Sequence, residues 1–248
     1  MIKFFRKIRQ RLLAENRFSK YLLYAIGEII LVVIGILIAL QINDWNQDRI
    51  NATKEHQFLG EIIINLEEDM GLIDMCLVYN KNKFKAIDSA FHFMSLMKNN
   101  KSLGKQFSSL LPVLTNSEFF YPSRVTFDGI ISTGQIEIIR SSELRKQISN
   151  YYSDKSLDGV QEQLKINTQS FLDITTPKMI NQEMAKFFTK RDFDVIPLER
   201  LTIHKDPDIL AKLFVMLNKT KEHNQRLTEM RTKITTLKDI ITQQRNTY

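Results

Sequence analysis

One stretch of the chain is apolar for long enough to fix a location. Tyr21–Leu40 spans twenty residues, and Glu28 is its only charged side chain. At a rise of about 1.5 Å per residue, a helix of this length crosses the hydrocarbon core of a bilayer, which is about 30 Å thick. We therefore predict a membrane-spanning helix over Tyr21–Ile42, with Trp45 as an anchor in the headgroup region.

Two other kinds of segment share this composition. A core helix of a soluble protein is one, but Ile29–Leu40 is apolar on every face, and a small domain rarely encloses such a helix. A cleaved signal peptide is the other, and it needs a small-x-small cleavage site. Leu37 stands where the first small residue before Ala39 is required. An uncleaved signal anchor fits better.

Beyond the span, apolar residues recur at three- and four-residue steps in three stripes, which lie over Leu59–Leu77, Leu157–Ile174 and Leu227–Ile241. This spacing places each stripe on one face of a helix. Glycine and proline are scarce, at 8 and 5 residues, which also favours helices over sheets. We predict an all-α fold: an N-terminal transmembrane helix followed by an antiparallel helical bundle with irregular loops, in which the stripes bury one another.

Polar and turn-forming residues predict where the first helices end. No turn cluster interrupts residues 44–65, so we expect the span to continue as one helix. The polar run Tyr79–Lys83 predicts a break, followed by a second helix over Phe84–Met97. Gly104–Ser123 contains two prolines and is expected to be a loop with short helical turns. Gly134 is a plausible stop for a short helix over Thr126–Ser132.

The second half of the chain reads as further helices with one ambiguous segment. Gln135–Arg140 suits either helix or strand, and Arg191–Asp206 suits either strand or loop. Ser141 or Ser142 can cap the next helix, because a serine hydroxyl accepts a hydrogen bond from a free backbone N–H. Helices are expected over Glu143–Tyr152, over Lys155–Thr175 with a break before Pro177, over Met179–Phe188, and after a cap at Asp206 or Asp208.

The net charge of +7 is concentrated at the N-terminus. Residues 1–20 carry seven basic side chains against Glu15, so the remainder of the chain is nearly neutral. A nucleic-acid surface on the main domain therefore loses its chief support, and no nucleic-acid partner is expected. Cations directly before a span favour a cytoplasmic N-terminus.

The same tail has apolar residues between its cations, as does a helix lying on an anionic leaflet. A charge cluster that only sets the topology would look alike, and both interpretations stay open. The candidate membrane-surface residues are Lys3, Arg6, Lys7, Arg9 and Arg11. We thus expect a cytoplasmic tail over residues 1–20, the span over 21–42 and a helical domain over 43–248 on the other side of the membrane. In a bacterial cell this membrane is the inner membrane and the domain is periplasmic.

Glu28 is the sharpest single candidate, because a carboxyl group within a span is costly. On a helix with about 100° per residue, Gly35 and Ala39 lie on the same stripe as Glu28. A small-xxx-small pair such as Gly35 and Ala39 lets two helices approach closely, which predicts a transmembrane helix contact and a homo-oligomer. The alternative is that Glu28, about two turns from the cytoplasmic surface, extends toward Lys20 or the headgroups of the lipid bilayer.

Other chemistry is sparse. The acidic run Glu67–Asp69 lacks the spacing of a calcium loop and is interpreted as a solvated helix face. The four histidines are scattered without metal-binding spacing and are expected at the surface. Cys76 has no partner for an internal disulfide, so it is either a buried residue, which we expect, or part of an intermolecular bridge. No nucleophile elbow, phosphate loop or Cys-x-x-Cys occurs, so we expect no enzyme activity and no metal or other cofactor.

The opening of the chain resembles a family of bacterial single-pass membrane proteins, a domain of unknown function. The resemblance rests on FFRKIRQRLL at Phe4–Leu13 and FSKYLLYAIGEIILVVIGILIALQINDWN at Phe18–Asn46, including Gly27 and Trp45. FDGIISTGQIEIIRSSELRKQISNYY at Phe127–Tyr152 is similar to the middle segment of that family. The resemblance implies a single-pass protein of the Gram-negative envelope and brings no activity, ligand or catalytic residue.

These observations favour a membrane-anchored interaction or scaffolding protein that binds an unidentified envelope protein. A signal-input domain is the first alternative, although about twenty residues before the span leave no room for an output domain. A membrane-tethered hydrolase is the second. A cleft with converging polar groups would favour an enzyme or sensor, whereas an exposed apolar patch would favour the interaction protein.

Overall fold

The computed structural model describes residues 18–97, 103–180, 182–194 and 203–246. The chain divides into two compact units, Met1–His56 and Gln57–Tyr248. The described residues form helices joined by irregular segments, without a strand, which confirms the all-α prediction.

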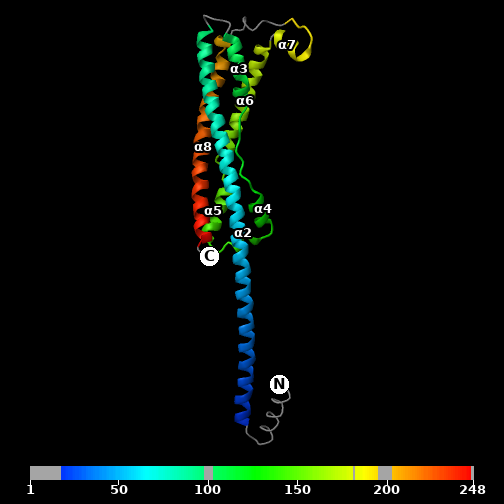
Figure 1. Cartoon of the computed structure of the whole chain (residues 1–248), viewed down its shortest axis with the longest axis vertical. Coiled ribbons are helices and arrows are strands. Elements are labelled where there is room, and N and C mark those ends of the chain that lie inside the picture. Colours follow the sequence, from blue (N-terminus) through cyan, green and yellow to red (C-terminus); the bar gives the residue numbers. More distant parts are fainter. Residues whose placement is uncertain (1–17, 98–102, 181, 195–202, 247–248) are drawn as a thin grey trace. The chain divides into compact units, whose positions relative to one another are not determined.

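The first long helix, α2, covers Phe18–Leu96 without interruption (Figure 1). The predicted continuation beyond residue 42 is confirmed, whereas the predicted break at Tyr79–Lys83 is wrong. Asn80 and Lys83 did not interrupt the helix, because both side chains point into the protein interior, where other segments supply their hydrogen-bond partners.

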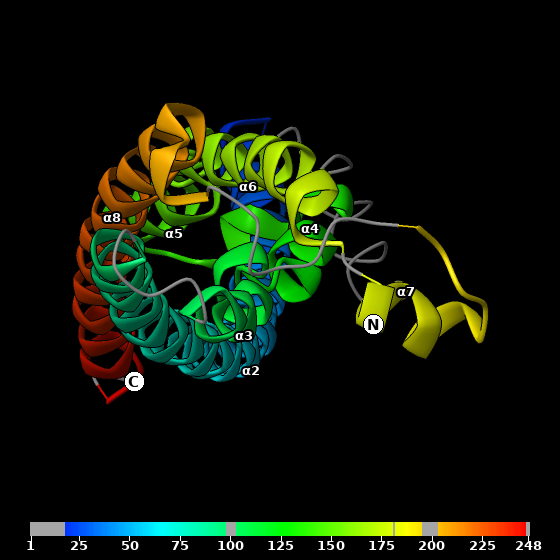
Figure 2. The same ribbon diagram turned by 90° about the horizontal axis from the view of Figure 1, so that it is seen from above.

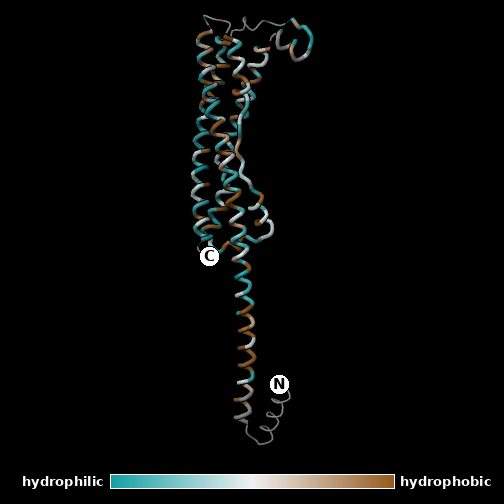
Figure 3. The backbone as a smooth tube through the Cα atoms, in the orientation of Figure 1, coloured by the Kyte–Doolittle hydropathy of each residue, from teal (hydrophilic) through white to brown (hydrophobic). Residues whose placement is uncertain are grey.

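The N-terminal part of α2 is the most hydrophobic stretch of the chain (Figure 3). Within the described residues, α2 is the one helix long and apolar enough to cross a membrane, and none of its most apolar window is buried. A core helix of a soluble domain would be mostly covered by neighbouring elements. The exposed window favours a membrane span or a signal anchor over such a core helix.

The second unit is a bundle built from the C-terminal part of α2 with α3 (Gly104–Thr115), α6 (Asp158–Met179) and α8 (Pro207–Asn246). These helices surround a common interior and alternate in direction along the chain (Figures 1 and 2). The shorter elements are α4 (Val125–Ser132), η2 (Gln135–Ile138), α5 (Ser142–Tyr152), α7 (Gln182–Thr189) and η4 (Ile203–Lys205).

Local signals set several helix ends as predicted. The Ser141 hydroxyl accepts a hydrogen bond from Leu144 N and caps α5. Asp206 Oδ1 accepts from the backbone N–H groups of Asp208 and Ile209 at the start of α8. Gly134 follows α4 in the left-handed conformation at φ 67°, which favours glycine. These short-range hydrogen bonds depend only on neighbouring residues, so the sequence reveals them.

Two proline predictions are wrong. Gly104–Thr115 is the helix α3 with Pro112 inside it, where a loop with short turns was predicted. Helix α6 likewise contains Pro177 and ends at Met179, where a break before the proline was predicted. Both prolines are exposed, so their rings lie on the outer face of their helices. The part of Arg191–Asp206 that lies at 195–202 falls outside the described residues.

Helices α2 and α8 pair in antiparallel directions with a seven-residue repeat. Glu67 pairs with Lys238 at 2.6 Å, and Asp74 pairs with Arg231 at 2.9 Å, so both helices advance by seven residues between the two ion pairs. Buried residues follow each helix at alternating three- and four-residue steps, as in a coiled coil. On α8 they are Ile209, Leu213, Met216, Thr220, His223, Leu227, Met230, Ile234, Leu237 and Ile241.

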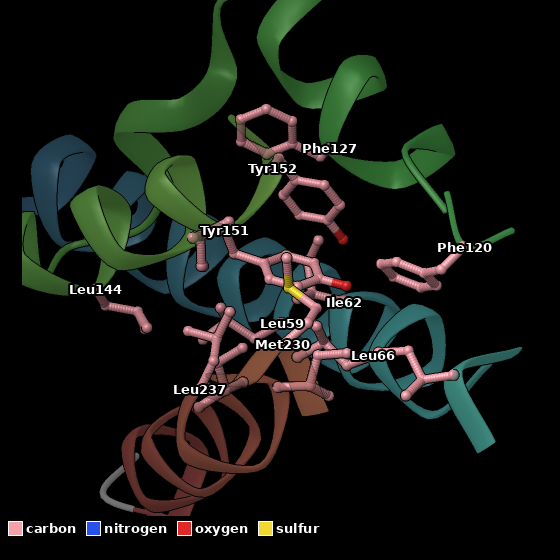
Figure 4. Close-up of a cluster of buried hydrophobic side chains, with 14 of the residues drawn as sticks. Leu59, Ile62, Leu66, Phe120, Phe127, Leu144, Tyr151, Tyr152, Met230 and Leu237 are labelled. Carbon is pink, nitrogen blue, oxygen red and sulfur yellow. The ribbon is translucent and has the colours of Figure 1, made fainter. Parts of the chain in front are cut away.

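The interior contains two hydrophobic cores. The first joins α2, α4, α5 and α8 and includes Leu66 and Ile234. The aromatic side chains of Phe127, Tyr151 and Tyr152 belong to this core (Figure 4). The second joins α2, α3, α6 and α8. The predicted stripes of α2 and α8 do bury each other, but the α6 stripe divides between the two cores.

Candidate interaction surface and buried polar layer

A groove of about 520 Å³ lies along one side of α2 and is open to solvent. We call it the α2 groove. Met75 and Val78 lie in it and are 59% and 62% exposed. The residues that line it are Gly71, Asp74, Met75, Val78, Tyr79, Asn82 and Glu118. Met75 and Val78 are three residues apart and therefore lie on the same face of α2.

The α2 groove arises from the segment between α3 and α4. Residues 116–124 are not helical, and Figure 1 shows this segment running beside α2. Lys83 Nζ donates to Asn116 O at 2.7 Å, and Ser123 N donates to Asp69 Oδ1 at 2.8 Å, so both ends of the segment are attached to α2. An extended chain is narrower than a helix, whose diameter is about 10–12 Å, so part of α2 stays uncovered.

The charges of the α2 groove are acidic. Asp74 and Glu118 line it, and no lysine or arginine is among its lining residues. Asp74 is paired with Arg231, whereas no cation pairs with Glu118 among the described residues. Glu118 also affects two neighbouring side chains. Burial and, to a smaller extent, the negative charge of Glu118 raise the pKa of Cys76 to about 11. The same two causes raise the pKa of Tyr79.

A second groove, of about 370 Å³, lies between α5 and α8. Its walls carry polar side chains, including Gln147, Asn150 and Thr232. Lys233 and Asp154 form an ion pair across it. The Gln147 Oε1 atom is buried without a hydrogen-bond partner. This groove presents fewer exposed apolar side chains than the α2 groove and is the weaker candidate for a protein surface.

Between the two cores lies a buried polar layer, which we define as Asn80, Lys83, Gln161 and His223. Asn80 Nδ2 contacts His223 Nδ1 at 3.3 Å, and His223 Nε2 contacts Gln161 Oε1 at 3.2 Å. The Gln161 amide also bonds both backbone groups of Phe120, accepting at 2.8 Å and donating at 3.1 Å.

The partners of His223 determine its protonation. The Asn80 amide nitrogen is a donor, so His223 Nδ1 accepts, and the Gln161 oxygen is an acceptor, so His223 Nε2 carries the proton. This is a neutral imidazole. Burial and, to a smaller extent, the positive charge of Lys83 lower the pKa of His223 to about 4. The prediction that the histidines lie at the surface is therefore wrong for His223, which is fully buried, although His56 and His92 are exposed.

Lys83 is buried beside this histidine. Its side chain is 1% exposed, and Nζ donates to Asn116 O and Ser117 Oγ, each at 2.7 Å. No carboxylate pairs with it in the described part of the chain, and burial lowers the pKa of Lys83 to about 8. A buried ammonium without a counter-ion destabilises the fold, because its desolvation is only partly offset by neutral hydrogen-bond acceptors.

Asp69 corrects a further prediction. Glu67 and Glu68 are exposed as expected for a solvated face, but Asp69 is fully buried. Its carboxylate accepts hydrogen bonds from Ser123 N and from the Tyr151 hydroxyl. Burial raises the pKa of Asp69, and the two hydrogen bonds oppose that shift. Asp69 thus holds α5 and the segment before α4 against α2, which is a structural role.

Among the described residues, no group of histidine, cysteine and acidic side chains could hold a metal ion. Cys76 is buried, as predicted, and burial keeps its thiol protonated. The lining of the two grooves includes no member of the buried polar layer, so these grooves give a substrate no contact with His223 or Lys83.

Four candidate site residues of the first unit lie in α2. Gly35 and Ala39 are exposed, and a Cβ at Gly35 would meet no atom within 4 Å. Glu28 is half-buried, in a shallow groove with Ala25 and Val32. Trp45 is 69% exposed, and its role as a headgroup anchor stays a prediction. The helix contact stays a prediction, and the membrane-surface residues Lys3, Arg6, Lys7, Arg9 and Arg11 lie outside the described residues.

The α2 groove and the buried polar layer were missed from the sequence. A signal for the layer was present, since the three- and four-residue spacing of α2 continues through Asn80 and Lys83 and that of α8 through Thr220 and His223. Polar residues at such core positions mark a buried contact. The groove had no comparable signal, because it depends on where residues 116–124 lie.

Comparison with known proteins gives one match. Residues 28–170 match a family of unknown function, DUF6090. No curated protein and no solved structure matches the chain.

Proposed function

This chain belongs to the DUF6090 family, and we propose that it is a membrane-anchored interaction protein whose bundle binds another protein through the α2 groove. The exposed apolar side chains of Met75 and Val78 carry the proposal. A soluble surface exposes such side chains side by side at a free-energy cost, and a protein partner removes them from water.

The anchor is the apolar part of α2. Its length, its composition and the exposure of its side chains support a single span in a bacterial inner membrane. The basic residues before it support a cytoplasmic N-terminus and therefore a periplasmic bundle. Reporter fusions at the C-terminus test this topology: an alkaline phosphatase fusion should be active, and an active cytoplasmic reporter there would reverse the orientation.

Site-specific photocrosslinking in intact cells tests the groove. A photoreactive amino acid replaces Val78 in the full chain, and Ile166 on α6 serves as the control, because the two side chains are 62% and 60% exposed. We expect an adduct with a second protein at position 78 and little or none at 166. Equal adducts at both positions, or none at 78, would contradict the proposal. An adduct that contains only copies of this chain would show self-association through the groove and would contradict the proposal that another protein binds there.

A further inference from the structure

We infer that the occupant of the α2 groove is a basic amphipathic helix of a partner protein. This inference rests on the proposed function and adds the chemistry of the partner. Three properties of the groove carry it: its length along α2, its apolar floor and the acidic side chains at its walls.

The length suits a helix. The lining runs from Gly71 to Asn82 on α2, which is about 17 Å at the helical rise of 1.5 Å per residue. A partner helix of about twelve residues has the same length. Helices that dock in grooves present apolar residues at i, i+3, i+4 and i+7, and such a stripe would follow the direction of α2.

The floor admits close approach. A Cβ built at Gly71 would meet no atom within 4 Å, so this position leaves open space on the exposed side of α2. Met75 and Val78 border that space. Methionine has a flexible, polarisable side chain that adapts to the shape of a partner, which suits a surface that receives apolar side chains.

The charges select the partner. Glu118 forms no ion pair among the described residues, since the nearby Lys83 Nζ donates to Asn116 O and Ser117 Oγ instead. Glu68 is exposed one turn before Gly71 on α2. The charge of Asp74 is offset by its ion pair with Arg231. With no lysine or arginine in the lining, a partner with lysine or arginine at the edges of its apolar stripe is attracted, whereas an acidic partner is repelled.

Two defined peptides test this inference on the full chain in nanodiscs of zwitterionic phosphatidylcholine. The first is a fluorescein-labelled helical peptide of about fourteen residues, with leucine at the helical spacing and lysine elsewhere, and the second has glutamate in place of each lysine. Fluorescence anisotropy is measured, and empty nanodiscs give the background for lipid binding. We expect saturable binding of the lysine peptide and at least about tenfold weaker binding of the glutamate peptide.

Matched variants locate the binding. Gly71 and Gly129 are both helical glycines whose added Cβ would meet nothing within 4 Å, so Gly71→Lys and Gly129→Lys make the same change at different sites. Gly71→Lys should weaken the lysine peptide about tenfold through blockage and repulsion, and Gly129→Lys should leave it unchanged. Circular dichroism verifies that both variants keep the helix content of the parent chain.

The outcomes separate the two claims. Equal binding of the glutamate and lysine peptides, or equal weakening by both glycine variants, would overturn the basic-helix inference. If a Val78 adduct with a second protein nevertheless forms in cells, the proposed function stands and only the partner chemistry is wrong. If peptide binding behaves as expected but no Val78 adduct forms, the groove is not used in cells and both claims fail.

Discussion

Helices α2 and α8 meet in two kinds of layer that follow one heptad spacing. Leu66 and Ile234 belong to an apolar core, whereas Asn80 and His223 belong to the buried polar layer between the cores. The apolar positions contribute through burial and close packing, which depend little on direction. The polar positions contribute only where donors meet acceptors, so their free energy depends on one alignment of the helices.

The comparison shows a division of roles. A shift of α8 by one heptad would still place apolar side chains opposite apolar side chains over much of its length. The same shift would separate Asn80 and Gln161 from His223 and leave buried polar groups without partners. We therefore interpret the apolar cores as the source of stability and the polar layer as the feature that fixes the register.

The largest expected effect is in the apolar core. Ile234→Ala removes a fully buried side chain and leaves a cavity, so the free energy of unfolding should fall by about 2–5 kcal/mol. Urea unfolding of the full chain in detergent micelles, followed by circular dichroism, measures this change. Thr232→Ala on the exposed face of α8 is the control and should change stability by less than about 0.5 kcal/mol. Similar losses in both would refute the assignment of the core.

The second-largest effect is expected from acid, which should destabilise the protein through the buried polar layer. The pKa of His223 is about 4 in the folded chain and 6.5 as its ordinary value, so the unfolded chain binds the extra proton between these two pH values. Stability is therefore lost as the pH falls from 6.5 to 4, by on the order of 3 kcal/mol from this group. The raised pKa of Asp69 acts in the opposite direction.

The comparison of the parent chain with His223→Gln isolates the histidine, since Asp69 is common to both. Glutamine takes up no proton over this range, so the variant should lose less stability between pH 6.5 and pH 4 in the same urea assay. An identical loss in both proteins would mean that His223 is not the group that resists protonation.

A smaller effect, of opposite sign, is expected at Lys83. Lys83→Met keeps the long side chain and removes the buried ammonium, and its former acceptors belong to Asn116 and Ser117, which are not buried. The variant should be more stable by about 1–3 kcal/mol at pH 7. The pKa of Lys83 is lowered from 10.5 to about 8, so the parent chain gains stability as the pH rises through this interval and the advantage of methionine shrinks. A destabilised variant at pH 7 would show that Lys83 stabilises the layer.

The smallest effect is expected at the surface ion pair. Glu67→Gln removes the ion-pair partner of Lys238. In the parent chain Lys238 Nζ lies 2.6 Å from Glu67 Oε1 at the surface. The loss should be below about 1 kcal/mol and should decrease in high salt, because exposed charges are screened. Glu68→Gln is the neighbouring control, since Glu68 forms no ion pair among the described residues. A loss as large as that of Ile234→Ala would place the stability of the α2–α8 pair in its charges.

Short-range signals predicted much of the fold. The Ser141 cap, the Asp206 cap and the left-handed Gly134 each involve residues within a few positions of one another. The continuation of α2 beyond residue 42 followed from the absence of any turn signal. Prolines were the main source of error in the helix ends, since Pro112 and Pro177 both lie inside helices whose tertiary packing outweighs the lost hydrogen bond.

The buried polar groups were misread for a different reason. Asn80 was taken as part of a helix break, yet its partner His223 lies 143 positions further along the chain. Asp69 was taken as solvated, yet its partner Tyr151 lies 82 positions away. A polar side chain between apolar neighbours looks the same in a sequence whether water or a distant donor satisfies it.

By itself, the sequence determined the helical class, the apolar segment of α2 and the core-facing stripes, because length, hydropathy and period are local properties of the chain. Only the tertiary structure decided which polar residues are buried and where α2 stays uncovered. Both depend on the path of residues 116–124 and on the alignment of α2 with α8. Hydrogen bonds and packing between residues distant in sequence set these features. The heptad spacing marks Asn80 and His223 as core positions, but it does not identify their hydrogen-bond partners.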